Sequence, residues 1–375
     1  MKMKWIVIRP KDASIEDRRL QEIWENVKST VFSDIPDPYM IHSAQELELL
    51  LKTPTALRGC RVLFVAAIGS YGVNLTLYSM LRLFRQFPDC MRQSAAAMII
   101  DGASELYTKA MASELALTLN LSGCTLIGRC LVEGTGSLYN FTVTAKNMNC
   151  DPMTAYQASA VDLAVRLAAF RFPSGTPAKI LCIHSSNRST SNTLRLWELV
   201  KEGIGADAQV REISLRNGEV KDCAGCSFET CMYYSRNLNC YYGGTIVDEV
   251  YPSLEWCDRL VLLCPNYNDA LGANLTAMIN RLTALFRKQP FYEKQLFALV
   301  VSGYSGSDLV QRQLIDSLSM NKGFVVPGHF ALTVTANLPG SLCRIDRIEE
   351  TAKDFGKYIS RKKTGLQDEA REKAW

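Results

Sequence analysis

Short apolar runs alternate with longer amphipathic stretches along the whole chain. In the second half the apolar runs are KILCIH, VREISL, RLVLLC, LFALVV and FVVPGHFAL, and helical patterns begin near Ser191, Ala273 and Ser307. In the first half, KWIVIR, RVLFVAAI, AAAMII and TLIGRCLV follow the same scheme. Buried strands alternating with helices are typical of doubly wound α/β units with a parallel sheet. Each half is therefore predicted to form a five-stranded unit that binds ligands beyond the carboxyl ends of its strands.

The two halves also match each other in sequence. GVNLT at residues 72–76 resembles GANLT at residues 272–276, an offset of 200 residues. Further landmarks recur in the same order and at nearly the same spacing: Ala97 and Ala298, Gly123 and Gly323, Gly128 and Gly328, Gly136 and Gly340. We predict a tandem duplication, with one domain at 1–172, a second at 178–362 and a charged C-terminal tail at 363–375. The boundary falls in the Pro- and Gly-bearing stretch RFPSGTPAK.

A run of small polar residues, SSNRSTSNT, follows the apolar run KILCIH and precedes a helical pattern. The free N–H groups in the first turn of a helix attract a phosphate dianion, and small residues let the backbone approach it. Capping of the helix accounts for one or two such residues, but not for nine in a row. We therefore interpret the loop as a phosphate site, with these candidate contacts: Ser186, Arg188, Ser191, Asn192 and Thr193.

This loop resembles the flavin-phosphate loop of the NAD(P)H-dependent FMN reductases, a flavodoxin-like family with the approximate pattern G-S-x-R-x-x-S-N-T. Ser185 stands where that family usually has Gly. Two later stretches, CPNYND and SGYSGS, are similar to the family's other flavin loops. Their candidate contacts are Pro265, Asn266, Tyr267, Asn268, Gly303, Tyr304, Ser305 and Gly306. The resemblance implies one FMN per chain, bound by the second half, with the flavin rather than a side chain carrying the chemistry.

The first half lacks this pattern in its leading loop, RPKDASIEDR. Pro10 and the acidic residues Asp12, Glu16 and Asp17 stand where the phosphate would bind, and carboxylates repel a dianion. The first half is thus expected to be a degenerate flavodoxin-like domain that binds no flavin by itself. Because the family commonly pairs two identical subunits around the flavin, the resemblance implies an intrachain pseudo-dimer or a homodimer.

The resemblance also implies an activity. It points to an FMN-dependent oxidoreductase that takes electrons from NADH or NADPH and passes them to a quinone, a small organic acceptor or a redox protein. The alternative is a non-enzymatic flavin or iron-sulfur electron carrier, or a redox sensor, with the first half as a docking domain. Tyr267 and Tyr304 either flank the flavin ring or cover strand ends, and His184 is expected to be a core residue.

Four of the 13 cysteines lie in one segment, DCAGCSFETCMYYSRNLNC, with the spacing C-x2-C-x4-C-x8-C. Cys223, Cys226, Cys231 and Cys240 could bind a [4Fe-4S] cluster, remain free thiols beside the flavin, or bind structural zinc. Iron-sulfur flavoproteins of this superfamily have a cysteine-rich loop in this position, with tighter spacing. We place the cluster first and zinc last.

The charge balance and the apolar runs argue against a nucleic-acid-binding protein and against a membrane protein. The chain has 42 basic and 38 acidic residues, too small an excess for a nucleic-acid surface. No apolar run approaches the roughly 18 residues that span a bilayer, and the N-terminal run KWIVI has only the length of a strand. We therefore expect a cytoplasmic protein with neither a nucleic-acid nor a membrane partner. An odd number of cysteines, mostly scattered, suits a reducing compartment.

Overall fold

The computed structural model describes residues 4–33, 36–172, 177–187, 189–215 and 220–361. The expected charged tail at 363–375 therefore lies outside the described residues. Two units can be distinguished. Unit 1 comprises Met1–Arg171 and Pro327–His329, and unit 2 comprises Phe172–Val326 and Phe330–Trp375.

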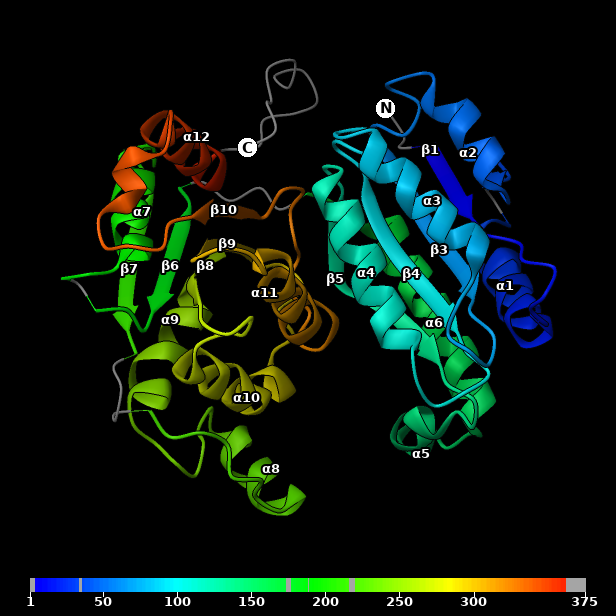
Figure 1. Ribbon diagram of the computed structural model, residues 1–375. Helices are drawn as coiled ribbons and strands as arrows, with labels where there is room; N and C mark the ends of the chain where they lie inside the picture. The colour runs from blue at the N-terminus through cyan, green and yellow to red at the C-terminus, as the bar shows by residue number, and fades with distance from the viewer. Residues whose placement is uncertain (1–3, 34–35, 173–176, 188, 216–219, 362–375) are drawn as a thin grey trace. The chain divides into compact units, whose positions relative to one another are not determined.

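Unit 1 contains an all-parallel five-stranded sheet with the strand order β2-β1-β3-β4-β5 (Figure 1). Its strands are β1 (Lys4–Ile8), β2 (Tyr39–Ile41), β3 (Cys60–Ala67), β4 (Ala95–Asp101) and β5 (Thr125–Gly134). Its helices are α1 (Arg18–Val31), α2 (Ala44–Leu51), α3 (Leu75–Gln86), α4 (Thr108–Leu121), η1 (Tyr139–Phe141), α5 (Thr142–Met148) and α6 (Pro152–Ala169). Every residue of β3 and β4 is buried, as expected for strands covered by helices on both faces.

Unit 2 contains a second all-parallel sheet, with the order β10-β9-β8-β6-β7. Its strands are β6 (Lys179–His184), β7 (Gln209–Ser214), β8 (Arg259–Asn266), β9 (Gln295–Ser302) and β10 (Ala331–Thr335). Its helices are α7 (Asn192–Lys201), α8 (Phe228–Arg236), η2 (Ile246–Val250), α9 (Tyr251–Trp256), α10 (Ala273–Lys288), α11 (Ser307–Leu314), η3 (Ile315–Met320), η4 (Ser341–Arg344) and α12 (Ile348–Ser360). In both sheets the first strand lies between the second and the third, so the predicted pair of doubly wound parallel sheets is confirmed.

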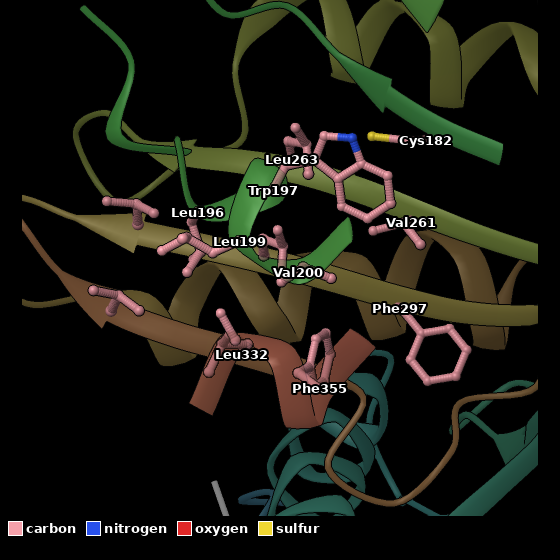
Figure 2. Close-up of a cluster of buried hydrophobic side chains, with 14 of the residues drawn as sticks. Cys182, Leu196, Trp197, Leu199, Val200, Val261, Leu263, Phe297, Leu332 and Phe355 are labelled. Carbon is pink, nitrogen blue, oxygen red and sulfur yellow. The ribbon is translucent and has the colours of Figure 1, made fainter. Parts of the chain in front are cut away.

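The core of unit 2 holds helix α7 against the sheet. Figure 2 shows Trp197 of α7 among side chains of neighbouring strands, including Val261 and Leu263 of β8. Phe297 of β9 and Phe355 of α12 belong to the same buried cluster. Trp197 is fully buried, and truncating such a side chain typically costs several kcal/mol of stability. The start of α7 therefore has a fixed position at the carboxyl edge of the sheet.

One strand prediction needs correction, and one predicted strand can now be located. The apolar run FVVPGHFAL does not form one strand, because β10 starts only at Ala331 and Pro327–His329 belong to unit 1. Pro327 has no N–H to donate to a strand ladder, which explains the interruption. The fifth strand predicted for the first half is β2, whose three residues had not been located because so short an edge strand has no detectable periodicity. By contrast, α10 and α11 begin at Ala273 and Ser307 as predicted.

The two units differ in the length of chain between the first and third strands. The sheet register pairs Lys4 with Cys60 in unit 1 and Ile180 with Arg259 in unit 2, so the pairings span 56 and 79 residues. The extra length in unit 2 follows β7 and contains α8 and the clustered cysteines. Among the described residues, no helix is long and apolar enough to cross a membrane.

Candidate functional site

The loops that follow β8 and β9 are joined by hydrogen bonds. Nδ2 of Asn266, the last residue of β8, donates to Ser302 Oγ at 3.2 Å and to the Ser305 carbonyl oxygen at 2.9 Å. A Cβ atom on Gly306 would lie 1.8 Å from Asp269 Oδ1, and Gly306 has a φ of +80°. Only glycine allows both this approach and this backbone conformation without strain. The predicted residues of these two loops therefore meet at the carboxyl edge of the sheet.

The side chain of Asn192 joins the start of α7 to the segment after β10. Its Nδ2 donates to the carbonyl oxygens of Ala336 at 3.1 Å and Leu338 at 2.8 Å, and its Oδ1 accepts from the Gly340 N–H at 3.0 Å. The amide is thus committed to the protein backbone, whereas the sequence suggested a contact with phosphate. Asn192 fixes the position of the loop by this bridge.

The remaining residues of the first loop have different environments. Ser191 caps α7, because its Oγ accepts from the Leu194 N–H at 3.1 Å. Thr193 is buried in the first turn of the helix, and Arg188 lies outside the described residues. Ser191 therefore has the capping role that polar residues before a helix commonly have.

Two buried polar atoms at this edge lack a hydrogen-bond partner. They are Ser186 Oγ, in the loop after β6, and Asn266 Oδ1, at the end of β8. The Ser186 N–H donates to His184 Nδ1 at 3.3 Å, so the buried His184 orients this part of the loop as a core residue. An unsatisfied buried polar group costs about 1–3 kcal/mol, which a bound polar ligand would relieve. The residues at this edge thus fit a ligand with several polar atoms, such as FMN.

The first loop also approaches the start of α10. Ser185 Oγ lies 3.6 Å from the position that a Cβ atom on Gly272 would take, and Gly272 immediately precedes α10. Asn274, in the first turn of α10, donates from Nδ2 to the carbonyl oxygen of Leu215, just beyond β7, at 3.1 Å. The segments that follow all five strands of unit 2 are therefore linked at one edge.

Two tyrosines of the predicted site are open to solvent. Tyr267 is 66% exposed and Tyr304 is 81% exposed, so neither covers a strand end as a core residue would. Pro265, by contrast, is buried within β8. Asn268 and Asp269 have φ values of +55° and +57°, a conformation that asparagine and aspartate adopt more readily than most residues. The exposed rings leave an aromatic face available at the site.

Two residues that hold these loops were missed by the sequence analysis. Gln313 of α11 accepts from the Leu271 N–H at 2.9 Å and donates to the Asp269 carbonyl oxygen at 3.1 Å, and so braces the loop after β8. Asn337 donates from Nδ2 to Tyr304 Oη at 2.7 Å, and a Cβ atom on Gly303 would lie 3.2 Å from Asn337 Oδ1. Neither residue belongs to a recognisable motif, so no sequence signal could have identified them.

In unit 1, a carboxylate of the protein occupies the start of α3. Asp12 Oδ2 accepts from the Leu75 N–H at 2.9 Å, and Asp12 Oδ1 accepts from the hydroxyl of Ser14 at 2.6 Å and from its N–H at 3.1 Å. The bond from the Ser14 side chain, followed by that from the Leu75 backbone, lowers the pKa of Asp12. An anionic side chain thus takes up a helix N–H group of the kind that could otherwise bind an anionic ligand.

A guanidinium fills the neighbouring part of the same edge. Arg19 donates to both carboxylate oxygens of Asp101 at 2.9 and 3.0 Å, and to the carbonyl oxygens of Gly102 at 2.9 Å and Gly136 at 3.1 Å. Burial raises the pKa of Asp101, although Arg19 opposes the shift. The carboxyl edge of unit 1 therefore contains an internally paired charge cluster.

The four clustered cysteines are not arranged as metal ligands. Cys223 and Cys226 lie in an irregular segment, Cys231 lies on α8, and Cys240 follows that helix. Over the part of the chain that the structure describes, no three His, Cys, Asp or Glu side chains are grouped to hold a metal ion. The expected [4Fe-4S] cluster, and equally zinc, is not supported by this arrangement.

Part of the chain matches a known protein family. Residues 178–337 match the family model of the NADPH-dependent FMN reductases. No curated protein matches the chain significantly. Solved structures similar to this chain include an NAD(P)H:quinone oxidoreductase from Methanothermobacter marburgensis, which is 12% identical with a TM-score of 0.38, over 50% of this chain and 98% of that one.

Two other solved structures have similar values. An FMN-dependent NADH-azoreductase from Bacillus anthracis is 11% identical with a TM-score of 0.33, over 49% of this chain and all of that one. A WrbA-like flavodoxin from Agrobacterium tumefaciens is 14% identical with a TM-score of 0.32, over 49% of this chain and 95% of that one. Because these scores are low, the assignment depends on the family model and on the observed fold.

The matched range contains all five strands of the unit 2 sheet and the three loops that suggested the family. The sheet has the strand order of a flavodoxin-like fold, with the first strand between the second and the third. The resemblance seen in the sequence is therefore confirmed. Residues 178–337 match the family model of the NADPH-dependent FMN reductases, and the domain that contains them has a flavodoxin-like fold.

Proposed function

We propose that unit 2 binds one FMN at the carboxyl edge of its sheet. We further propose that the protein uses NADH or NADPH to reduce a quinone or another small organic acceptor. The observation that carries the proposal is the pair of buried, unpartnered polar atoms, Ser186 Oγ and Asn266 Oδ1, on loops that converge at this edge. Their environment suits a polar ligand, and the family match supports FMN as that ligand.

The phosphate of FMN is assigned to the loop before α7. The N–H groups at the start of this helix carry partial positive charge, and Ser186 and Thr193 supply hydroxyls beside them. Ser191 keeps the helix start in place as its cap, and Asn192 ties the loop to the segment after β10. These residues bind and orient the cofactor without taking part in the chemistry.

The ring of FMN is assigned to the loops after β8 and β9. Asn266 and the backbone between Gly303 and Gly306 present polar groups there, and Tyr267 and Tyr304 add aromatic surface. FMN, when bound, accepts a hydride and passes on electrons singly or in pairs. The protein therefore needs to hold the ring, tune it with hydrogen bonds and leave access for the donor and the acceptor. The exposed tyrosines are consistent with such access.

A pair of serine variants tests the assignment. Ser186→Ala should weaken FMN binding about tenfold, because a buried hydroxyl loses its ligand contact, while the apoprotein keeps its stability. Ser191→Ala is the matched control, and should lower apoprotein stability by about 1 kcal/mol through loss of the helix cap. Quenching of FMN fluorescence gives the affinity, and urea unfolding of the apoprotein gives the stability. Unchanged affinity in Ser186→Ala would contradict the phosphate assignment.

The activity has its own test. Purified protein loaded with FMN should oxidise NADH or NADPH in the presence of a quinone, which is followed by the loss of nicotinamide absorbance. A protein that binds FMN but oxidises neither nucleotide, with any quinone or small acceptor supplied, would instead be an electron carrier or a redox sensor. The two outcomes separate the enzyme from the non-enzymatic alternative.

A further inference from the structure

The cysteine segment, defined here as residues 220–245, is a part of unit 2 that the flavin site does not use. It accounts for much of the greater length between the first and third strands compared with unit 1. It contains Cys223, which is exposed, and three half-buried cysteines, Cys226, Cys231 and Cys240. Seven of the other nine cysteines are buried, and burial raises the pKa of Cys90 and of Cys257 to about 12. The segment thus holds most of the accessible thiols.

Helix α10 anchors both ends of the segment. Asn280 donates from Nδ2 to Asp222 Oδ1 at 3.0 Å, and the same oxygen accepts from the Cys223 N–H at 2.6 Å. Arg281 donates from Nη1 to the Lys221 carbonyl oxygen at 3.2 Å and from Nη2 to the Gly243 carbonyl oxygen at 2.6 Å. The backbone on either side of Cys223 is therefore anchored to helix α10.

The guanidinium of Arg281 has one N–H group without a hydrogen-bond partner. The residue is only 3% exposed, and its Nε has no hydrogen-bond partner. Its Cζ lies 5.9 Å from the centre of the Tyr242 ring, and Tyr242 itself contacts Cys226. Arg281 and Cys226 therefore both contact the same tyrosine ring.

The second cysteine of the segment contacts a tyrosine near the segment's end. The thiol of Cys226 donates to Tyr242 Oη over 3.9 Å. The pKa of Tyr242 is raised first by this hydrogen bond, then by partial burial and by the charges of Cys226 and Cys223. Gly225, between them, has a φ of +74° and open space around its Cβ position, so the chain turns sharply there.

We propose that Cys223 and Cys226 form a reversible dithiol/disulfide site that exchanges electrons with low-molecular-weight disulfides. Cys223 is the attacking residue because it is exposed and its backbone is anchored. Cys226 is the resolving residue, because it follows Cys223 by three positions in the same irregular segment. The site is separate from the proposed flavin chemistry and does not depend on it.

The exchange balances without any other reagent. The Cys223 thiolate attacks one sulfur of a disulfide R–S–S–R, forms a mixed disulfide and releases one thiolate, which takes up a proton. The Cys226 thiolate then attacks the Cys223 sulfur, forms the Cys223–Cys226 bond and releases the second thiol. The protein loses two electrons and two protons, and the substrate gains them as two R–SH. Excess thiol reverses both steps.

Glutathione is the probe for this exchange. The full-length protein is equilibrated without air at several ratios of reduced to oxidised glutathione, quenched with acid and alkylated with N-ethylmaleimide. Peptide mass spectrometry should show a Cys223–Cys226 disulfide that grows as oxidised glutathione increases and disappears in excess reduced glutathione. Cys226→Ser should accumulate about tenfold more glutathione on Cys223 than the wild type, because the resolving thiol is missing.

Cys343 supplies the control, since it is exposed and lies on η4, outside the cysteine segment. Cys343→Ser should leave the midpoint of the Cys223–Cys226 couple unchanged. Maleimide on both Cys223 and Cys226 at every glutathione ratio would overturn the proposal. So would pairing of Cys223 with Cys231 or Cys240 in place of Cys226. Four irons with matching sulfide in anaerobically purified protein would also overturn it, because the thiolates would then be cluster ligands.

Discussion

The Nε of Arg61 donates a 3.0 Å hydrogen bond to the carbonyl oxygen of Leu167, near the C-terminal end of the last helix of unit 1. In unit 2, Arg259 donates to the carbonyl oxygens of Ile359 and, at 3.0 Å, of Arg361, at the end of α12. Each arginine stands at the start of the third strand of its unit. The same hydrogen-bonded link between the third strand and the last helix thus occurs in both units, as expected for a duplicated chain.

Loss of this tie should destabilise unit 2. Arg259→Met should lower the free energy of unfolding by about 2 kcal/mol, because carbonyl oxygens at a helix end lose a buried donor. Urea unfolding, followed by fluorescence in a background that keeps the buried Trp197 as its sole tryptophan, gives the value for this unit. Arg18→Met is the control, since Arg18 is exposed on α1. If Arg259→Met changed the free energy of unfolding by less than about 0.5 kcal/mol, as ordinary surface substitutions do, the stabilising role of Arg259 would be contradicted.

Removal of the Asp12 carboxylate should have a pH-dependent effect on unit 1. Asp12→Ala should cost about 1 kcal/mol at neutral pH, the usual value for a lost helix cap. Because the pKa of Asp12 is lowered in the folded protein, its contribution is present above its ordinary value of about 3.9 and disappears as the pH falls below it. Urea unfolding at several pH values checks this. Glu16→Ala, in the same loop, should show no pH-dependent loss of stability. If Asp12→Ala remained less stable than the wild type in acid, the role of the Asp12 carboxylate would be refuted.

The buried pair in unit 1 gives a larger effect. Arg19→Met should destabilise unit 1 by about 3 kcal/mol at neutral pH, because it leaves Asp101 charged and unpaired. Since burial already raises the pKa of Asp101, the carboxyl becomes protonated as the pH falls, and the defect should then shrink. The double variant Arg19→Met/Asp101→Asn should recover part of the loss. Equal stability of the single and double variants at neutral pH would show that the charge is not the cause.

Gly306 should be irreplaceable at the proposed flavin site. Gly306→Ala places a methyl group against Asp269 Oδ1 and strains a positive φ, so the loops after β8 and β9 must separate. FMN affinity should fall at least about tenfold, a loss of roughly 1.4 kcal/mol. Gly205→Ala is the control, because its nearest neighbouring atom, on Asp207, is 3.2 Å away and its φ is not positive. Fluorescence titration with FMN compares them, and equal affinities would count against the assigned ring site.

Local patterns in the sequence predicted much of the fold. The strands and the starts of α10 and α11 follow from apolar periodicity and helix-start residues, which depend on near neighbours. Partners distant in the chain could not be predicted in this way. The amide of Asn192 bonds to the backbone near Leu338, and Gln313 braces Asp269 from another helix. A motif names the residue type at a site, but packing decides which group each side chain contacts.

The arrangement of the clustered cysteines, likewise, could not be predicted from the sequence. Their spacing suggested a set of metal ligands, because it counts residues along the chain and not distances in space. The structure places Cys231 on a helix and leaves Cys223 and Cys226 in an irregular segment. In unit 1, likewise, the acidic loop indicated that phosphate would be repelled, but only the structure shows that Asp12 bonds to the start of α3.

The greater length between the first and third strands of unit 2 has a small entropic consequence. Closing a loop of 79 residues in place of 56 costs only about 0.3 kcal/mol more, because closure entropy grows with the logarithm of length. Residues 220–245 could therefore be gained, shortened or exchanged with little effect on sheet closure itself. Such a segment is free to diverge in chemistry while the parallel sheet and its cofactor loops keep their geometry.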